Sequence, residues 1–372
     1  MIKSTLKAAI FALGLSLAAF PAAAQQSKPL TYSNYLPPTH ASNRYGLEPL
    51  FKAVEQDTKG SLKIELHPGG VLVGGKGTLA AMRDGLIDGG FVVSLYVPNE
   101  IPRNTTMSDL AFLVEDPLVA MGAVNETVLL DCPECLQEYH KYKTVYLGAY
   151  STTPYVMMCK KPVETLADLK GLKMRAAGAV YSRWAVAMGG VPVNIPNAEA
   201  YEALERGQLD CVIGSISWLQ TLSLWDVAKN VINAPMGAYF GGALIAFNED
   251  SWKRVKEADR AAFVKQVPAA LAKLAVGYVK DDRDVEAQAR TKGVQIRKAD
   301  AALSNLLAEY RKNEMQSAAE AAKKRGVKNP EAIINAFVKN LKKWEAIVAK
   351  TGHDQAKFEQ ALREEIYNKA KF

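Results

Sequence analysis

A short pattern that occurs twice in the chain constrains its fold more than any other feature. The segments 81–88 (AMRDGLID) and 203–210 (ALERGQLD) each end a predicted helix, pass a glycine and enter an apolar strand at an aspartate. Gly85 and Gly207 would each take the positive φ that a helix C-terminus needs. One such junction is common in α/β proteins. The pattern alone therefore leaves open whether the chain has two similar lobes or merely two ordinary junctions.

The order of the predicted elements around the two copies favours two lobes. Short apolar strands alternate with amphipathic helices and short connections, which predicts parallel sheets covered by helices. Around the first copy the expected elements are strand 30–35, helix 41–58, strand 62–66, helix 77–84 and strand 87–95. Around the second copy they are strands 156–159, 172–175, 191–194, 211–213 and 242–247 and helices 180–188 and 198–206.

The last third of the chain is predicted to be helical. One long pattern rich in Ala and Lys covers 258–292, and amphipathic helices follow at 303–324, 332–350 and 358–367. The alternating charges there are typical of solvated helix faces.

The start of the chain predicts an export signal. Lys3 and Lys7 precede an apolar stretch over 8–20, Pro21 follows, and three alanines supply the small residues of a cleavage site. Cleavage after Ala24 would leave 348 of 372 residues, with a net charge of +5 in place of +7. The mature protein is then expected in the periplasm, away from cytoplasmic ATP and NAD. This location excludes enzymes that depend on cytoplasmic ATP or NAD.

Composition and charge exclude further classes of protein. Apolar residues make up 49% and charged residues 23%, as in ordinary globular proteins. The mature part has no apolar run near the roughly 18 residues that a membrane span needs. The positive charge is too small and too scattered to predict a nucleic-acid partner.

The four cysteines, Cys132, Cys135, Cys159 and Cys211, leave three full pairings open. Cys132 and Cys135 form a Cys-x-x-Cys motif, which in an oxidising compartment favours a local disulfide. A periplasmic thiol–disulfide enzyme that uses this pair is the alternative hypothesis. No second Cys-x-x-Cys is present and the four histidines are dispersed, so we predict no metal site and no cofactor.

A glycine-rich segment imitates a nucleotide site. Gly70 to Lys76 (GVLVGGK) fits the first seven positions of a phosphate-binding loop, but Gly77 stands where that motif requires Ser or Thr. We therefore predict a loop at the cleft edge that lets the backbone or a small ligand approach closely.

Three stretches of the second predicted lobe carry a family resemblance. They are 166–175 (LADLKGLKMR), 188–193 (MGGVPV) and 200–210 (AYEALERGQLD). In this order they resemble the extracytoplasmic solute-binding proteins of tripartite ATP-independent periplasmic (TRAP) transporters, with similarity over about 30–292.

The resemblance implies an α/β, two-lobed periplasmic-binding-protein-like fold. We expect parallel-rich mixed sheets, a long connecting helix and a helical C-terminus. The expected division is signal peptide 1–24, lobe I 25–152 plus about 241–257, lobe II 153–240, and 258–372 for the long helix and C-terminal helices packed across both lobes. The lobes would open and close about crossover strands near Thr153 and Gly241.

The resemblance also implies reversible binding of an organic anion without catalysis, followed by docking to a membrane permease. In the family an arginine of the Gly-x-Lys-x-Arg motif pairs with the ligand carboxylate, and here that residue is Arg175. A planar guanidinium matches the two oxygens of a carboxylate. The alternative is an ordinary salt bridge between Arg175 and an aspartate of the lobe surface. A ligand-sensing subunit of a signalling system is a second alternative function.

The other candidate ligand-binding residues are less charged than in some relatives. Tyr155 stands where some relatives place a second arginine, and Gly214, next to Ser215, stands where many place an asparagine. The remaining candidates are Trp218, Asn34, Ser94, Tyr239 and Phe240. Much aromatic area and little charge predict an aromatic or hydroxy/keto monocarboxylate as the ligand. The sequence leaves the oligomeric state open.

Overall fold

The structure is a computed structural model that describes residues 28–372. The predicted signal peptide lies outside the described residues. The two predicted lobes each contain a small parallel sheet of the same topology. In each, a central strand pairs in parallel with two neighbours. The strands are β1 (Leu30–Ser33), β2 (Ile64–His67) and β3 (Gly89–Gly90) in lobe I and β5 (Lys173–Arg175), β6 (Val191–Val193) and β7 (Cys211–Ser215) in lobe II.

The repeated junction performs the same task in both lobes. Gly85 and Gly207 take φ values of +72° and +71°, as the pattern predicted. The aspartate that follows each glycine binds the start of the central strand. Asp88 Oδ2 accepts from the Thr31 backbone N–H at 2.9 Å. Asp210 Oδ2 accepts from the Lys173 backbone N–H at 2.8 Å. The repeat therefore reflects two copies of one βαβ arrangement.

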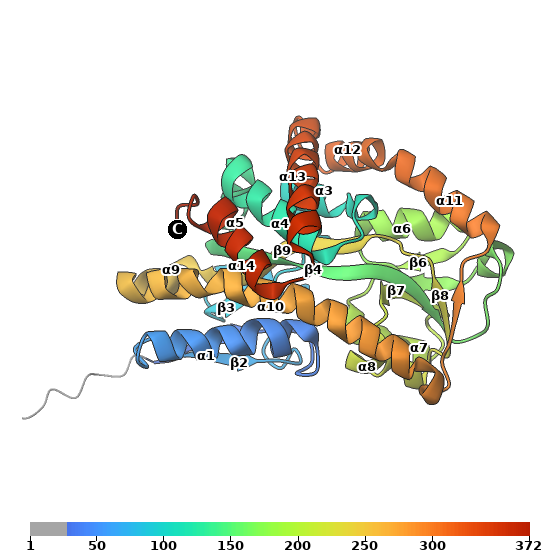
Figure 1. Ribbon diagram of the computed structural model, residues 1–372, viewed down its shortest axis with the longest axis horizontal. Coiled ribbons are helices and arrows are strands. Elements are labelled where there is room, and N and C mark those ends of the chain that lie inside the picture. Colours follow the sequence, from blue (N-terminus) through green and yellow to red (C-terminus); the bar gives the residue numbers. More distant parts are fainter. Residues whose placement is uncertain (1–27) are drawn as a thin grey trace, which may run out of the picture.

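Two long antiparallel strands, β4 (Thr144–Cys159) and β9 (Ala238–Asn248), join the lobes. The strand order β2-β1-β3-β9-β4-β7-β5-β6 makes one continuous mixed sheet (Figure 1). β4 pairs with β9 as far as Pro154 and with β7 from Tyr155 onward. The change of partner thus falls beside Thr153, and the division of the chain into lobes at this residue stays a prediction.

Helices cover both faces of this sheet. The N-terminal and lobe II helices are α1 (Glu48–Asp57), α2 (Thr78–Arg83), α3 (Pro102–Ser108), α4 (Pro117–Glu126), α5 (Pro133–Lys141), α6 (Gly178–Ala187), α7 (Ala200–Glu205), α8 (Trp218–Thr221) and α9 (Glu249–Arg254). The C-terminal part adds α10 (Glu257–Ala289), α11 (Ala301–Lys312), α12 (Glu314–Lys324), α13 (Pro330–Thr351) and α14 (Gln355–Leu362). Two more strands, β8 (Asn230–Asn233) and β10 (Gln295–Lys298), pair in parallel beside β4.

The long helix α10 is the predicted connection between the lobes. Figure 1 shows it running on one side of β4, while α11, α12 and α13 lie on the other side. The span Glu257–Lys292 is long and apolar enough to cross a membrane by length and composition, but 56% of its most apolar window is buried inside the protein. Because this helix packs against α1, α14 and β4, it is a core helix of the fold.

Three predicted elements were wrong in extent. The strand expected over 156–159 is only the end of β4, which begins at Thr144. The strand expected over 87–95 pairs in β3 only at Gly89 and Gly90, and its end turns into a 3₁₀ segment over Ser94–Tyr96. The helix expected over 303–324 is divided at Asn313 into α11 and α12, and this break turns Glu314 into the interior, where it is fully buried. The apolar periodicity of the sequence continues through Asn313, so the periodicity could not reveal the break in the helix.

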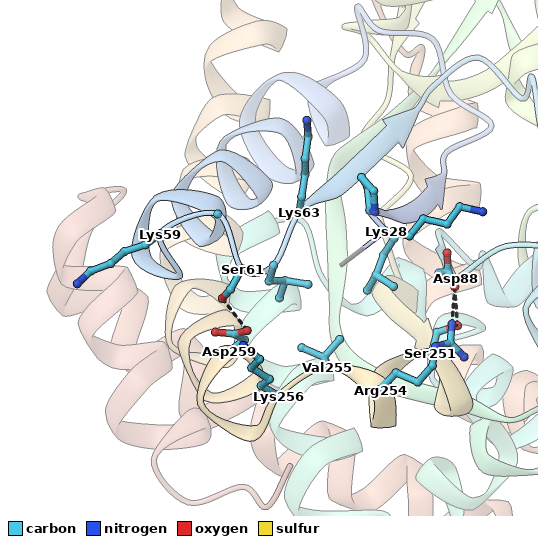
Figure 2. Close-up of a pocket in the computed structure, with 14 residues that line it drawn as sticks. Lys28, Lys59, Ser61, Lys63, Asp88, Ser251, Arg254, Val255, Lys256 and Asp259 are labelled. Carbon is cyan, nitrogen blue, oxygen red and sulfur yellow. Dashed lines mark hydrogen bonds and ion pairs between the residues drawn. The ribbon is translucent and has the colours of Figure 1, made fainter. Parts of the chain in front are cut away.

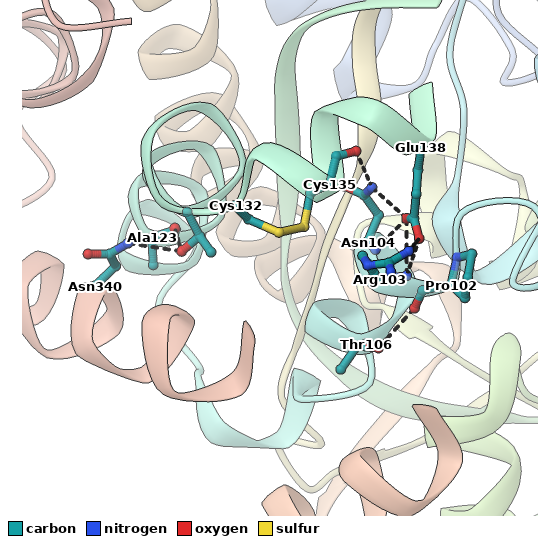
Figure 3. Close-up of a disulfide and its surroundings, with 10 residues drawn as sticks. Pro102, Arg103, Asn104, Thr106, Ala123, Cys132, Cys135, Glu138 and Asn340 are labelled. Carbon is teal, nitrogen blue, oxygen red and sulfur yellow. Dashed lines mark hydrogen bonds and ion pairs between the residues drawn. A yellow bond between two sulfur atoms is a disulfide. The ribbon is translucent and has the colours of Figure 1, made fainter. Parts of the chain in front are cut away.

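The cysteines form two disulfides, Cys132–Cys135 and Cys159–Cys211. The first opens α5, as Figure 3 shows, and both of its residues are buried. Farther along α5, Glu138 accepts hydrogen bonds from the backbone N–H groups of Arg103 and Asn104 at 2.9 and 3.1 Å. The second disulfide joins β4 to β7 within lobe II. The local disulfide predicted for the Cys-x-x-Cys motif is therefore confirmed.

Candidate functional site

Arg175 occupies the carboxyl end of β5, the central strand of lobe II. Its side chain is only 1% exposed. Nε donates to the Ile195 carbonyl at 3.0 Å and Nη1 donates to the Ile213 carbonyl at 3.1 Å. These two bonds fix the plane of the guanidinium against lobe II. They direct Nη2 toward lobe I, where it donates to the Tyr96 hydroxyl at 3.0 Å.

All of these partners are uncharged. Among the described residues no carboxylate forms an ion pair with Arg175, so the alternative of a salt bridge to a surface aspartate is not what the structure shows. A buried cation without a counter-charge is costly, because the protein replaces only part of its hydration. The arrangement favours the entry of an anion beside the guanidinium.

Tyr96 connects the two lobes at this point. Its hydroxyl oxygen, carried by lobe I, accepts from Arg175 Nη2 and from the Asn197 backbone N–H at 3.1 Å. The same hydroxyl donates to Asn197 Oδ1 at 3.2 Å. Two buried donors of lobe II thus converge on one oxygen of lobe I.

Arg175 lies in the wall of a small cavity between the lobes. The wall is largely aromatic and consists of Tyr35, Val93, Leu95, Tyr96, Tyr150, Tyr155, Arg175, Ala177, Asn197 and Tyr239. The cavity measures about 10 Å³, which is about the space of one water molecule. An organic acid could therefore enter only if the lobes or the aromatic side chains move.

Three tyrosines of this wall have hydroxyls that stay protonated at physiological pH. Burial raises the pKa of Tyr155, Tyr239 and Tyr35 above the usual tyrosine value, although the Arg175 cation partly opposes this for Tyr155. The wall can therefore offer hydroxyl donors and aromatic faces, while its one full charge is positive. Among the described residues no group of three or more His, Cys, Asp or Glu side chains is placed to hold a metal ion.

The indole ring of Trp218 packs against the guanidinium of Arg175. Arg175 Cζ lies 5.3 Å from the centroid of its ring, and the ring lies so close to Gly214 that a Cβ there would meet it at 2.1 Å. Trp218 Nε1 donates to the Tyr278 hydroxyl of α10 at 3.0 Å. Tyr278 in turn lies 3.3 Å from His40 Nε2, and burial lowers the pKa of His40 to about 3. These buried, uncharged contacts connect Trp218, which packs against Arg175, to His40 of lobe I.

The structure brings three of the predicted ligand-binding residues to the cavity wall, Arg175, Tyr155 and Tyr239. Ser94 stands behind the wall, with its Oγ 3.4 Å from the Tyr239 hydroxyl and 2.7 Å from Ser108 Oγ. Trp218 and Gly214 lie beneath Arg175 as described above.

The other three predicted residues do not line this cavity. Asn34 donates to Ser42 Oγ and Asn43 Oδ1 at 3.1 and 2.7 Å, which fixes the loop after β1. Ser215 Oγ accepts from the Thr153 hydroxyl at 3.2 Å. Phe240 stacks on a phenylalanine of α13, with ring centroids 4.8 Å apart.

Sequence reasoning missed seven residues of the wall, and four of these carry a polar group, namely Tyr35, Tyr96, Tyr150 and Asn197. Tyr35 and Tyr96 follow the carboxyl ends of β1 and β3, which is where open α/β sheets bind ligands. That rule could have singled them out. The glycine-rich loop predicted at the cleft edge contacts Tyr35 as well, since a Cβ at Gly75 would lie 3.1 Å from its ring.

Similarity to known proteins covers most of the chain. The profile of the family described as bacterial extracellular solute-binding protein, family 7, matches residues 32–305. A solute-binding protein of Albidiferax ferrireducens is 26% identical over 188 residues, which are 50% of this chain and 54% of that protein. The chain thus spans only about half the length of that relative.

Solved structures match over a greater length. A TRAP periplasmic solute-binding protein of Bordetella bronchiseptica, with bound (R)- and (S)-mandelate, is 26% identical at a TM-score of 0.73, over 85% of this chain and 99% of that one. A TRAP solute-binding protein of Rhodoferax ferrireducens in complex with benzoate is 18% identical at a TM-score of 0.76, over 87% of this chain and 100% of that one. These matches show the two-lobed periplasmic binding fold.

Proposed function

The chain belongs to family 7 of the bacterial extracellular solute-binding proteins, and we propose that it captures a small monocarboxylate at Arg175 between its lobes. Members of this family are transport receptors and not enzymes, which argues against a thiol–disulfide enzyme that uses Cys132 and Cys135. The family is periplasmic, and we propose that a cleaved signal peptide delivers this chain to that compartment and that it passes its ligand to a TRAP membrane permease.

The buried guanidinium without an acidic partner carries this proposal. In the closed arrangement Arg175 donates only to neutral oxygens, so a carboxylate would be the first full counter-charge it meets. Exclusion of water strengthens that pairing. Closure then follows from ligand binding, because residues of both lobes contact the ligand only when the lobes meet.

The wall of the cavity supports an aromatic or hydroxy/keto acid rather than a sugar acid or dicarboxylate. Among residues 28–372, five tyrosines and one cation line the cavity, and no second cation does. Aromatic faces can stack on a ring, and the tyrosine hydroxyls can bond a hydroxyl or keto oxygen. The Bordetella relative, which is 26% identical, holds mandelate, an acid of this kind.

A thermal-shift screen would test the ligand class. Mandelate, benzoate, pyroglutamate, an aliphatic 2-oxoacid, a sugar and an amine are added separately to the mature protein, since a ligand that binds only the native state raises its Tm. We expect shifts with the aromatic or hydroxy/keto monocarboxylates and none with the sugar or the amine. Shifts with the sugar alone would contradict the proposed class.

Calorimetry on variants would test Arg175. With the best acid of the screen, Arg175→Ala should weaken binding by about 2–5 kcal/mol, the cost of removing one partner of a buried charge pair. Arg175→Lys should also bind poorly, because the two parallel donors are lost. Arg206→Ala is the matched control, since Arg206 is an exposed arginine of the same lobe. Equal affinities of wild type and Arg175→Ala would exclude the role given to Arg175.

A further inference from the structure

A second concavity lies far from Arg175, at the outer end of lobe I. It measures about 720 Å³ and is lined by the chain before and at β1, the turn between α1 and β2, and the junction of α9 with α10 (Figure 2). Leu30 and Lys63 mark the amino ends of β1 and β2 at this groove, whereas the Arg175 cavity lies at the carboxyl ends of the strands. The two sites therefore occupy opposite edges of the sheet of lobe I.

Basic side chains surround the mouth of this groove. The groove is lined by five cationic residues, Lys28, Lys59, Lys63, Arg254 and Lys256. Among the described residues only Arg254 of these five forms an ion pair, with Asp88 at 3.3 Å. Figure 2 shows Lys28, Lys59 and Lys63 pointing away from one another around the mouth.

The two acidic residues of the groove are occupied within the protein. Asp88 accepts from the Thr31 backbone and from Ser251 Oγ, and these bonds help to lower its pKa. Asp259 accepts from Ser61 Oγ at 2.7 Å. Neither carboxylate is directed at the lysines of the rim. The groove thus keeps an excess of three positive charges.

The amino end of α10 also opens at this groove, although Glu257 and Asp259 in its first turn offset part of its positive potential. The helix is 33 residues long, and Lys256 at its N-cap provides no side-chain cap. The first backbone N–H groups of a helix have no partner within the helix, and its dipole places partial positive charge at this end. The helix end alone would not make a site, but here it opens into a cationic groove.

Part of the lining of the groove is apolar, since Pro29, Leu30, Leu62 and Val255 contribute to it beside the basic side chains. A flat membrane surface would reach the lysines at the mouth but would not fill the concavity. A protein segment that carries acidic side chains around one apolar side chain would complement both parts.

We propose that this groove, lined by Lys28, Lys59, Lys63, Lys256 and Val255, is a docking surface for an acidic segment of a partner protein with an apolar side chain at its centre. The proposal goes beyond ligand capture and holds whichever acid Arg175 binds. Electrostatic attraction at the rim would speed the encounter, and the apolar contact would fix the position.

Photo-crosslinking would test the docking surface. The mature protein with Lys63→p-benzoylphenylalanine is irradiated on membranes of the source bacterium, and the crosslinked peptide is identified by mass spectrometry. The same probe at Lys339, an exposed position of α13, is the control. We expect one membrane protein, crosslinked through a segment rich in Asp and Glu, only from position 63. The yield should fall about tenfold or more at about 0.5 M NaCl, where charges are strongly screened.

Charge reversal provides the matched variants. Lys28→Glu with Lys59→Glu should lower the crosslink yield by about tenfold or more, and Lys339→Glu with Lys342→Glu, which changes the net charge equally, should leave it within about twofold. The affinity for the organic acid should be unchanged in both, which separates this proposal from the function of Arg175. Equal crosslinking from positions 63 and 339, a target segment without acidic residues, or crosslinks to phospholipid alone would overturn the proposal.

Discussion

Deletion of one oxygen, in Tyr96→Phe, should shift the receptor toward its open form. In the structure this hydroxyl accepts from Arg175 Nη2 at 3.0 Å and from the Asn197 N–H at 3.1 Å. Both donors belong to buried residues of lobe II, so in the closed variant they would lose their partner. An unpaired buried donor costs about 1–3 kcal/mol. In the open form water can satisfy both donors, and the variant then costs little.

The magnitude follows from these two bonds. Two such donors together cost about 2–6 kcal/mol in the closed form alone, which corresponds to a closing constant about 30- to 25,000-fold smaller. A ligand that needs the closed form binds more weakly by the same factor when that form is rare. Small-angle scattering should show a larger radius of gyration for the free variant, and calorimetry with the best acid should show the weaker binding.

A matched tyrosine controls for the loss of a hydroxyl. Tyr367 donates to the Leu147 carbonyl at 2.9 Å, away from the cleft, and Tyr367→Phe should leave both measurements unchanged. If Tyr96→Phe keeps the radius and the affinity of the wild type, the hydroxyl does not hold the lobes together. A third outcome is a larger radius of gyration for the free variant with unchanged affinity. It would mean that an oxygen of the bound ligand accepts from Arg175 and Asn197 in place of the hydroxyl, and it too would refute the reasoning about affinity.

Three further changes should alter stability. Burial raises the pKa of Glu314 to about 8, so the native state keeps a proton that the unfolded chain releases above about pH 4.5. Stability should fall as the pH rises through this window. Urea midpoints should show a smaller fall for Glu314→Gln than for the wild type, and part of the fall remains because burial also raises the pKa of Asp282, to about 7. Replacing Cys159 and Cys211 by Ala removes a disulfide that joins positions 52 residues apart, and it should lower the free energy of unfolding by about 4 kcal/mol through chain entropy. Calorimetry should show a Tm lower by several degrees. A decrease in Tm no larger than that caused by removing the Cys132–Cys135 disulfide would contradict this expectation. Gly214→Ala places a Cβ 2.1 Å from the Trp218 ring and should destabilise by about 1–3 kcal/mol with a changed near-UV spectrum, whereas an unchanged spectrum would show that the ring is free to move.

The architecture could be predicted because it follows from patterns that are local in the chain. The glycine of each repeated junction takes a positive φ, and the aspartate after it binds the neighbouring strand, in both lobes alike. The wall of the site could be predicted only in part, because it depends on which of two adjacent side chains faces inward. At the end of β1 the sequence predicts Asn34 as a ligand-binding residue, but its amide donates to the following loop, and the neighbouring Tyr35 lines the cavity.

Residues that meet only through tertiary packing gave no signal in the sequence. Tyr96 and Asn197 are 101 positions apart, and nothing near either one indicates that a hydroxyl and an amide will pair between lobes. Glu314 lay within a predicted solvated helix, and only the break at Asn313 turns it toward Arg183. In both cases the deciding contact is one that neither helical nor strand periodicity describes.

The two lobes are alike in topology and unlike in chemistry, and this difference suggests an order of events. Thr31 and Lys173 are bound by equivalent aspartates, and two residues later in each central strand stand Ser33 in lobe I and Arg175 in lobe II. Of the two central strands, only β5 therefore carries a cation at this position, and its guanidinium is already oriented by carbonyls of its own lobe. We propose that a carboxylate binds lobe II first, while the cleft is open. Lobe I, which contributes tyrosine rings and the Tyr96 hydroxyl, would then add contacts that depend on the body of the acid. Charge would thus select the class of ligand before closure, and the aromatic wall would select among acids during closure.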